Sequence, residues 1–231
     1  MSVRFIDQYG AILFDMCGTF MFGHDRFGPE DDLFATYGRL GGARLSRGEL
    51  DEAFRLALEL MRERYDAPEH FEDFPSVREC FEPFCDAADL GDLETVFVAH
   101  EIGRIPEENQ TFLRDLKRTH WIGVVSNICA HPDRWVSQSP DAETFRAFDH
   151  LVFSSEGRVI KPSLRIFERA LAAVPAGKRV LVVGDNLQRD IIPAKSLGLG
   201  TAWIAPVASA HPDADVAVQR LTDLATLKPR P

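Results

Sequence analysis

The chain has 231 residues, enough to bury a substantial core in one large domain or in a core with a smaller insert. Its 36 acidic and 26 basic residues give a net charge of −10, which repels nucleic acid and anionic membrane surfaces. Its apolar runs fall far short of the roughly 18 residues that span a bilayer, and the N-terminus lacks the apolar stretch of a signal peptide. We therefore expect a soluble, cytoplasmic protein with no nucleic-acid or membrane partner.

Short apolar runs, each closed by a polar residue or Gly, predict β-strands at 11–14, 121–125, 151–153, 180–183 and 201–204. Runs this short and this apolar are typical of parallel strands buried on both faces. Helical patterns lie between them, one opening at Pro106 and another following Pro162 and Ser163. The alternation predicts an α/β fold with a doubly wound parallel sheet, whose ligands bind beyond the carboxyl ends of the strands.

Residues 23–105 break this alternation and predict an all-helical insert. Two capping boxes, Ser46 with Glu49 and Ser76 with Glu79, mark helix starts, and a helical stretch over 29–40 ends at Gly41. The segment is too long for a loop of a compact α/β domain. We predict a core domain formed by 1–22 and 106–231 and a separate helical domain formed by 23–105.

Polar residues follow the predicted strands where the ends of a parallel sheet converge on one crevice. They include Asp15, Ser126, Lys161, Asp185 and Asp190. Carboxylates of this kind suit Mg²⁺, while an ammonium and a hydroxyl suit a neighbouring anion. A carboxylate such as that of Asp15, fixed beside a phosphoryl group, can attack it to form an aspartyl phosphate.

Two of these assignments have alternatives. Asp190 could instead cap the helix that contains Ile191 and Ala194. Lys195 could brace Asp190 or its loop, or it could lie on a solvated helix face. In the insert, Arg62, Arg64 and His70 could reach a substrate, although solvated positions are the default for such residues.

Four segments, in this order and strand context, resemble the four motifs of the haloacid dehalogenase (HAD) superfamily of hydrolases. They are Phe14-Asp15-Met16-Cys17-Gly18-Thr19, Val124-Val125-Ser126-Asn127, Ile160-Lys161-Pro162, and Gly184-Asp185 with Asp190. The resemblance extends over essentially the whole chain. It implies a Rossmann-like core with a helical cap of the type that follows the first motif.

The resemblance also implies roles for individual residues. Asp15 would be the nucleophile and a ligand of Mg²⁺, together with Asp185, Asp190 and the backbone carbonyl of Cys17. The catalytic residues would be Asp15, Cys17 and Lys161. Gly18, Thr19, Ser126, Asn127 and Lys161 would bind the substrate.

Cys17 departs from the family pattern, in which phosphatases carry an Asp that protonates the leaving oxygen and activates water. Losing a positioned acid or base costs about 10²- to 10⁴-fold, or roughly 3 to 5 kcal/mol of barrier. We therefore predict an Mg²⁺-dependent phosphatase with weakened acid catalysis, acting on a small phosphorylated metabolite. Two alternatives remain open: a phosphate- and metal-binding regulatory protein with reduced turnover, or a hydrolase whose leaving group needs no proton, as in acyl phosphates or dehalogenation.

Other features of the sequence concern the type of reaction, the cysteines and the oligomeric state. Residues 23–105 contain no Lys, which argues against phosphonate cleavage through a Schiff base on the cap. The cysteines Cys17, Cys80, Cys85 and Cys129 lack the spacing of a zinc ribbon or a disulfide framework, so free thiols are expected. A redox link between Cys17 and Cys129 is the alternative. The sequence leaves both a monomer and a homodimer open.

Overall fold

The computed structural model describes residues 4–205 and 210–229. Within them, six parallel strands form one sheet in the order β3-β2-β1-β4-β5-β6. The strands are β1 (Ala11–Phe14), β2 (Trp121–Ser126), β3 (His150–Phe153), β4 (Val180–Gly184), β5 (Gly200–Ile204) and β6 (Val216–Val218). The doubly wound sheet and its first five strands are confirmed, and β6 is an additional edge strand.

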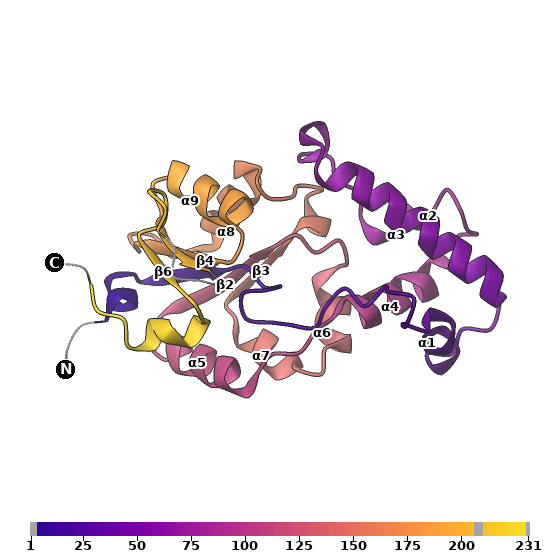
Figure 1. Ribbon diagram of the computed structural model, residues 1–231, viewed down its shortest axis with the longest axis horizontal. Helices are drawn as coiled ribbons and strands as arrows, with labels where there is room; N and C mark the ends of the chain where they lie inside the picture. Colours follow the sequence, from indigo (N-terminus) through magenta and orange to yellow (C-terminus); the bar gives the residue numbers. More distant parts are fainter. Residues whose placement is uncertain (1–3, 206–209, 230–231) are drawn as a thin grey trace.

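Helices cover both faces of the sheet because successive strand residues point to opposite sides (Figure 1). In β1, Ala11 and Leu13 pack in one buried cluster, whereas Ile12 and Phe14 pack in the other. The first cluster takes in residues of α8 (Leu164–Ala173) and α9 (Ile192–Ser196). The second takes in residues of α5 (Glu107–Lys117), α6 (Pro132–Gln138) and α7 (Ala142–Ala147).

The segment between β1 and α5 is helical, as expected, and its helices gather at one end of the molecule (Figure 1). They are α1 (Leu33–Arg39), α2 (Arg47–Tyr65), α3 (Val77–Phe81) and α4 (Leu90–Glu101). Both predicted capping boxes form, with Ser46 before α2 and Ser76 before α3. We call residues 23–105 the helical insert.

The helical insert is packed firmly on the loops at the carboxyl ends of the strands. Backbone hydrogen bonds join Phe74 N to Arg158 O at 2.7 Å and Ile160 N to Phe71 O at 2.9 Å. The Arg158 side chain also pairs with Asp73 and Glu79 of the insert. One buried apolar cluster runs from the sheet into the insert, so burial is continuous between them.

The remaining helical elements are single turns at Phe5–Gln8, Pro68–His70, Ser154–Glu156, Leu187–Ile191 and Leu221–Ala225. Leu187–Ile191, labelled η4, is a π-helical turn directly after β4. Across the described ranges 4–205 and 210–229, no helix has the length and apolar character needed to cross a membrane.

Candidate active site

Asp15 lies directly after β1, buried at the centre of the sheet's carboxyl edge. The chain then turns tightly, because the Met16 carbonyl accepts hydrogen bonds from the backbone amides of residues 19–21. This turn brings the Thr19 hydroxyl back to Asp15, where Oγ1 donates to Oδ2 at 3.2 Å. Ser126, the last residue of β2, donates from Oγ to Oδ1 of Asp15 at 3.1 Å.

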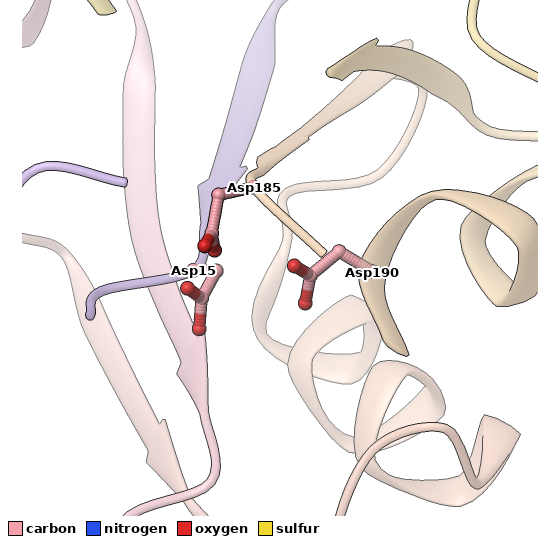
Figure 2. Close-up of side chains that lie close together, drawn as sticks. All are labelled: Asp15, Asp185 and Asp190. Carbon is pink, nitrogen blue, oxygen red and sulfur yellow. The ribbon is translucent and has the colours of Figure 1, made fainter. Parts of the chain in front are cut away.

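Three carboxylates meet at this point, those of Asp15, Asp185 and Asp190 (Figure 2). One oxygen from each lies within 4.8 Å of the others. The position of the Asp185 carboxylate beside the first motif depends on Gly18, whose φ is +83°. A Cβ there would lie 2.4 Å from Oδ2 of Asp185, so a larger residue would push this carboxylate away. The three acidic residues that the sequence singles out are therefore neighbours in space.

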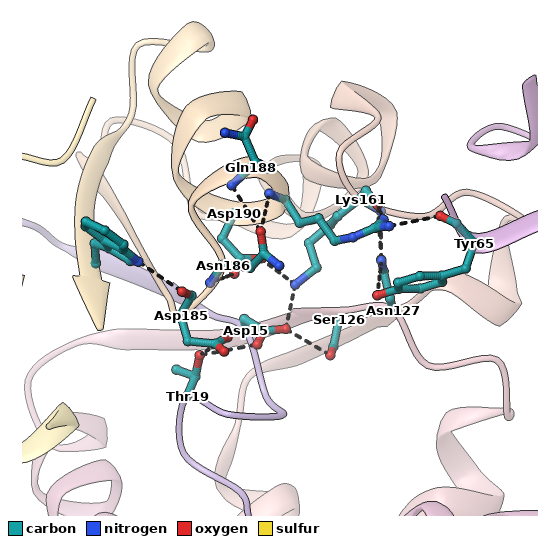
Figure 3. Close-up of polar contacts among 12 residues, drawn as sticks. Asp15, Thr19, Tyr65, Ser126, Asn127, Lys161, Asp185, Asn186, Gln188 and Asp190 are labelled. Carbon is teal, nitrogen blue, oxygen red and sulfur yellow. Dashed lines mark hydrogen bonds and ion pairs between the residues drawn. The ribbon is translucent and has the colours of Figure 1, made fainter. Parts of the chain in front are cut away.

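Lys161 lies among these carboxylates and is itself buried (Figure 3). Its Nζ is 2.5 Å from Oδ1 of Asp15 and 2.6 Å from Oδ1 of Asp190. Burial alone would lower the pKa of Lys161, but the charges of Asp15 and Asp190 outweigh it and raise the pKa. The side chain is thus a permanent cation between two buried acids.

The acidic cluster is short of positive charge even with Lys161 present. Burial, followed by the charges of Asp15 and Asp190, raises the pKa of Asp185 to about 7. Burial also raises the pKa of Asp190 to about 6, although Lys161 opposes the shift. A cation at this cluster would relieve the repulsion, and carboxylate oxygens are the ligands that Mg²⁺ prefers.

Asn127 fixes the loop that carries Lys161. Its Oδ1 accepts from the Lys161 backbone amide at 2.7 Å, and its Nδ2 donates to the Lys161 carbonyl at 3.1 Å. The same Nδ2 donates to the hydroxyl of Tyr65, at the end of α2, at 3.3 Å. Hydrogen bonds of Asn127 therefore connect the end of β2 with the Lys161 loop and with the helical insert. A phosphate-binding role for Asn127 stays a prediction.

Arg189 makes a second link between the core and the helical insert. From the η4 turn its guanidinium donates to the carbonyls of Lys161 at 2.6 Å and Tyr65 at 2.9 Å, and to Oδ1 of Asp66 at 2.6 Å. It also lies 3.9 Å from the centre of the Tyr65 ring. Arg189 and Tyr65 are not among the site residues predicted from the sequence, because no motif spacing signals their role.

Cys17 lines the pocket that contains Asp15 and Lys161. Burial, then the charge of Asp15, raises the pKa of the Cys17 thiol well above its ordinary value. The thiol therefore keeps its proton at neutral pH and is a poor acid. All four cysteines are free thiols, and Cys129 lines a different pocket from Cys17.

The structure decides two of the alternatives left open by the sequence. Asp190 does not cap a helix start. It is buried in the η4 turn, whose N-cap residue is Asn186, and its Oδ2 accepts a hydrogen bond from the Asn186 backbone amide at 3.0 Å. Lys195 does not brace Asp190, because its Nζ pairs with Oδ1 of Asp215 at 2.5 Å.

Two adjoining pockets open at the carboxyl edge of the sheet. The catalytic pocket, of about 200 Å³, is lined by Asp15, Cys17, Ser126, Lys161, Asp185 and Asp190, and also by His24, Asp25 and Glu101. The second, of about 530 Å³, shares Asp25, Tyr65, Glu101 and Asn127 with it and extends over the helical insert. Arg62 lines this second pocket. Neither Arg64 nor His70 lines either pocket.

The parallel sheet with an acidic cluster at its carboxyl edge is the arrangement of a doubly wound α/β protein whose ligand site lies beyond the strand ends. A model of the haloacid dehalogenase-like hydrolase family matches residues 9–198, and the chain belongs to that family. This confirms the family that the four motifs indicate.

Similar proteins include phosphatases and dehalogenases. The pyrimidine 5'-nucleotidase YjjG of Escherichia coli (strain K12) is 46% identical over 59 residues, 25% of this chain and 26% of the relative. The glyceraldehyde 3-phosphate phosphatase of Pyrococcus furiosus is 30% identical over 100 residues, 43% of this chain and 41% of the relative. The chain thus matches well under half the length of either relative.

Solved structures of the same fold cover nearly the whole chain. A HAD phosphatase from Thermococcus onnurineus superposes with a TM-score of 0.60 at 22% identity, covering 93% of this chain and 95% of that one. A 2-haloacid dehalogenase from Pseudomonas syringae pv. Tomato DC3000 gives a TM-score of 0.62 at 21% identity, covering 93% and 96%. These likenesses establish the fold.

Proposed function

We propose that the protein is an Mg²⁺-dependent phosphatase that hydrolyses a small phosphorylated metabolite through an aspartyl phosphate on Asp15. One observation carries the proposal: a buried carboxylate stands beside a buried ammonium, a hydroxyl donor and two further carboxylates. The ammonium and hydroxyl suit a phosphoryl group, and the further carboxylates suit a metal beside it. The phosphatases among the similar proteins support the same reading.

The residues present fit a magnesium ion. Asp15, Asp185 and Asp190, together with the backbone carbonyl of Cys17, would hold it, and the crowding that raises the pKa of Asp185 and Asp190 would be relieved. When bound, Mg²⁺ would offset the charge of the substrate phosphate and of the attacking carboxylate.

The side chains of the pocket divide the remaining work. Asp15 attacks phosphorus and becomes phosphorylated, which splits one difficult displacement into two easier ones. Lys161 and Ser126 bind the transferring group, with an ammonium and a hydroxyl aimed where negative charge accumulates. Thr19 donates a hydrogen bond to Asp15, and Gly18, which has no side chain, leaves room for the carboxylate of Asp185.

The second pocket suits the part of the substrate that leaves. Apolar side chains of the helical insert line it, with Arg62 as a cation at its side. Its volume of about 530 Å³ falls in the range of small-molecule sites. We propose that residues 23–105 act as the cap domain over a core made of 1–22 and 106–231, and that the cap selects the substrate and excludes water.

A substrate panel tests this function. The purified protein, with and without Mg²⁺, is assayed for phosphate release from p-nitrophenyl phosphate, acetyl phosphate and a set of sugar and nucleoside phosphates, alongside Asp15→Asn. We expect Mg²⁺-dependent turnover by the wild type and none by the variant. Release by Asp15→Asn at the wild-type rate would refute the mechanism. Binding of phosphate without turnover of any substrate would favour a regulatory protein instead.

A further inference from the structure

The two chain segments that connect the core with the helical insert lie side by side. The Phe22 amide donates to the Arg104 carbonyl at 2.9 Å, and the Arg104 amide donates to the Phe22 carbonyl at 2.8 Å. Further along, the Asp25 amide donates to the Glu101 carbonyl at 3.4 Å. This pairing places Glu101, the last residue of α4, in the wall of the catalytic pocket with Asp15 and Cys17.

The Glu101 carboxyl is buried without a partner. The residue is 7% exposed, and its Oε2 has no hydrogen-bond partner within the described residues. In the same pocket, Asp15 and Asp190 are both held by Lys161. A buried polar atom without a hydrogen bond costs about 1 to 3 kcal/mol, so folding stability gives no reason to keep a glutamate here.

The surroundings of Glu101 favour the acid over the carboxylate. Burial, followed by the charge of Asp25, raises the pKa of Glu101 well above its usual range. Both effects favour the protonated carboxyl, which can give its proton to a base that forms beside it.

We propose that Glu101, at the end of α4 in the helical insert, is the general acid and base of this site. It takes over the proton transfers that an Asp performs in family phosphatases, at the position where this chain has Cys17. The inference rests on the phosphatase function proposed above. It assigns a catalytic residue that reaches the pocket from the end of α4, outside the four motifs.

The proton movements balance over the two half-reactions. In the first, a carboxylate oxygen of Asp15 bonds to phosphorus, the bond from phosphorus to the leaving oxygen breaks, and that oxygen takes the Glu101 proton as the alcohol departs. In the second, the Glu101 carboxylate removes a proton from water, whose oxygen bonds to phosphorus as the bond to Asp15 breaks. Phosphate leaves, and Asp15 and protonated Glu101 are both restored.

The test compares a substrate that needs the proton with one that does not. For Glu101→Gln, kcat/KM is measured with Mg²⁺ on glycerol phosphate, a poor leaving group, and on p-nitrophenyl phosphate, a good one. We expect a loss of about 10²- to 10⁴-fold on glycerol phosphate and less than about tenfold on p-nitrophenyl phosphate. Asp92→Asn, on the exposed side of the same helix, is the matched control and should leave both values unchanged.

Cys17→Asp provides a rescue that a purely structural role for Glu101 would not allow. Combined with Glu101→Gln, it should restore most of the kcat/KM on glycerol phosphate that Glu101→Gln alone loses. Circular dichroism and thermal unfolding of each variant show whether it folds. If Glu101→Gln does not fold, Glu101→Asp, which keeps the acid, serves in the same comparison and should lose less on the poor leaving group than Glu101→Ala.

Each other outcome overturns the proposal. Equal losses on both substrates, or no loss on glycerol phosphate, would remove Glu101 from acid catalysis while the Asp15 mechanism stands. The same leaving-group dependence in His24→Asn, and its absence in Glu101→Gln, would assign the proton to His24, which lines the same pocket. A wild type that hydrolyses neither substrate would overturn both this proposal and the phosphatase function.

Discussion

Cys17 departs from the family pattern in its side chain, whereas the metal-binding role that we propose for it uses only its backbone carbonyl. Burial and the charge of Asp15 keep the thiol protonated, so it contributes neither an acid nor a metal ligand through sulfur. We predict that Cys17→Ala changes kcat/KM by less than about tenfold, below the effect of removing a true acid or base. Steady-state kinetics with Mg²⁺ measures it, and a loss of 10²-fold or more would show that the thiol takes part.

Lys161 offers a second prediction at the residue scale. Without added divalent cation, Lys161→Met leaves Asp15 and Asp190 buried with no counter-charge, so we expect the free energy of unfolding to fall by about 3 to 5 kcal/mol at about pH 8. The loss should shrink at about pH 5, because the carboxyls can then bind protons.

Urea unfolding at both pH values measures this change. Lys117→Met, which breaks a more exposed pair with Asp149, is the matched control and should cost less than about 1 kcal/mol. Equal effects of the two substitutions would contradict the idea that Lys161 compensates a buried acidic cluster.

The residues of the site were predictable to the extent that they follow strands. Asp15, Ser126, Asp185 and Asp190 stand at or near strand ends, and the topology of a parallel sheet brings such positions together. Glu101, Tyr65 and Arg189 were not predictable. Glu101 and Tyr65 reach the site from the ends of helices in the insert, and Arg189 acts there through hydrogen bonds to backbone carbonyls. No sequence spacing marks such contacts.

At the scale of elements, the link from the η4 turn to the end of α2 depends on Arg189. Arg189→Ala would leave the Lys161 and Tyr65 carbonyls without this donor, so we predict a loss of about 1 to 3 kcal/mol of stability and a higher KM. Chemical unfolding and steady-state kinetics measure the two effects. Arg55→Ala, in an exposed set of ion pairs on α2, should cost less than about 1 kcal/mol, and parity between the two variants would contradict the prediction.

The elements differ in how much the sequence reveals of them. Strands β1, β2 and β4 are buried almost throughout, and α2 and α3 begin at capping boxes, so local chemistry specifies them. Strand β6 has three residues at the sheet edge and is specified by pairing with β5. The short helices α6 and α7 lack a long apolar period and form where Trp135 and Phe145 pack into the core.

At the scale of the whole molecule, the acidic cluster makes the free energy of unfolding depend on pH, and we expect it to depend on Mg²⁺ as well. The pKa values of about 7 for Asp185 and about 6 for Asp190 exceed the ordinary value near 4. Between about pH 4 and pH 7 the unfolded chain has lost these protons while the metal-free folded protein keeps them, so their contribution to stability falls as pH rises. Mg²⁺ bound as proposed would compete with the same protons.

We therefore predict that the rise in Tm caused by saturating Mg²⁺ is small at about pH 5 and grows toward about pH 8. Thermal unfolding with and without Mg²⁺ measures it. Asp185→Asn, which removes one of the three carboxylates, should abolish most of the gain. A gain that is independent of pH, or one that persists in the variant, would place the metal elsewhere.

The proposed mechanism requires Asp15 to carry the phosphoryl group during turnover. The Mg²⁺-loaded protein is mixed with p-nitrophenyl phosphate, quenched in acid within the turnover time, digested and analysed by mass spectrometry. We expect one phosphoryl group on the peptide that contains Asp15, and none when the protein carries Asp15→Asn. A phosphoryl group on another residue, or turnover by a wild type that never becomes phosphorylated, would contradict it.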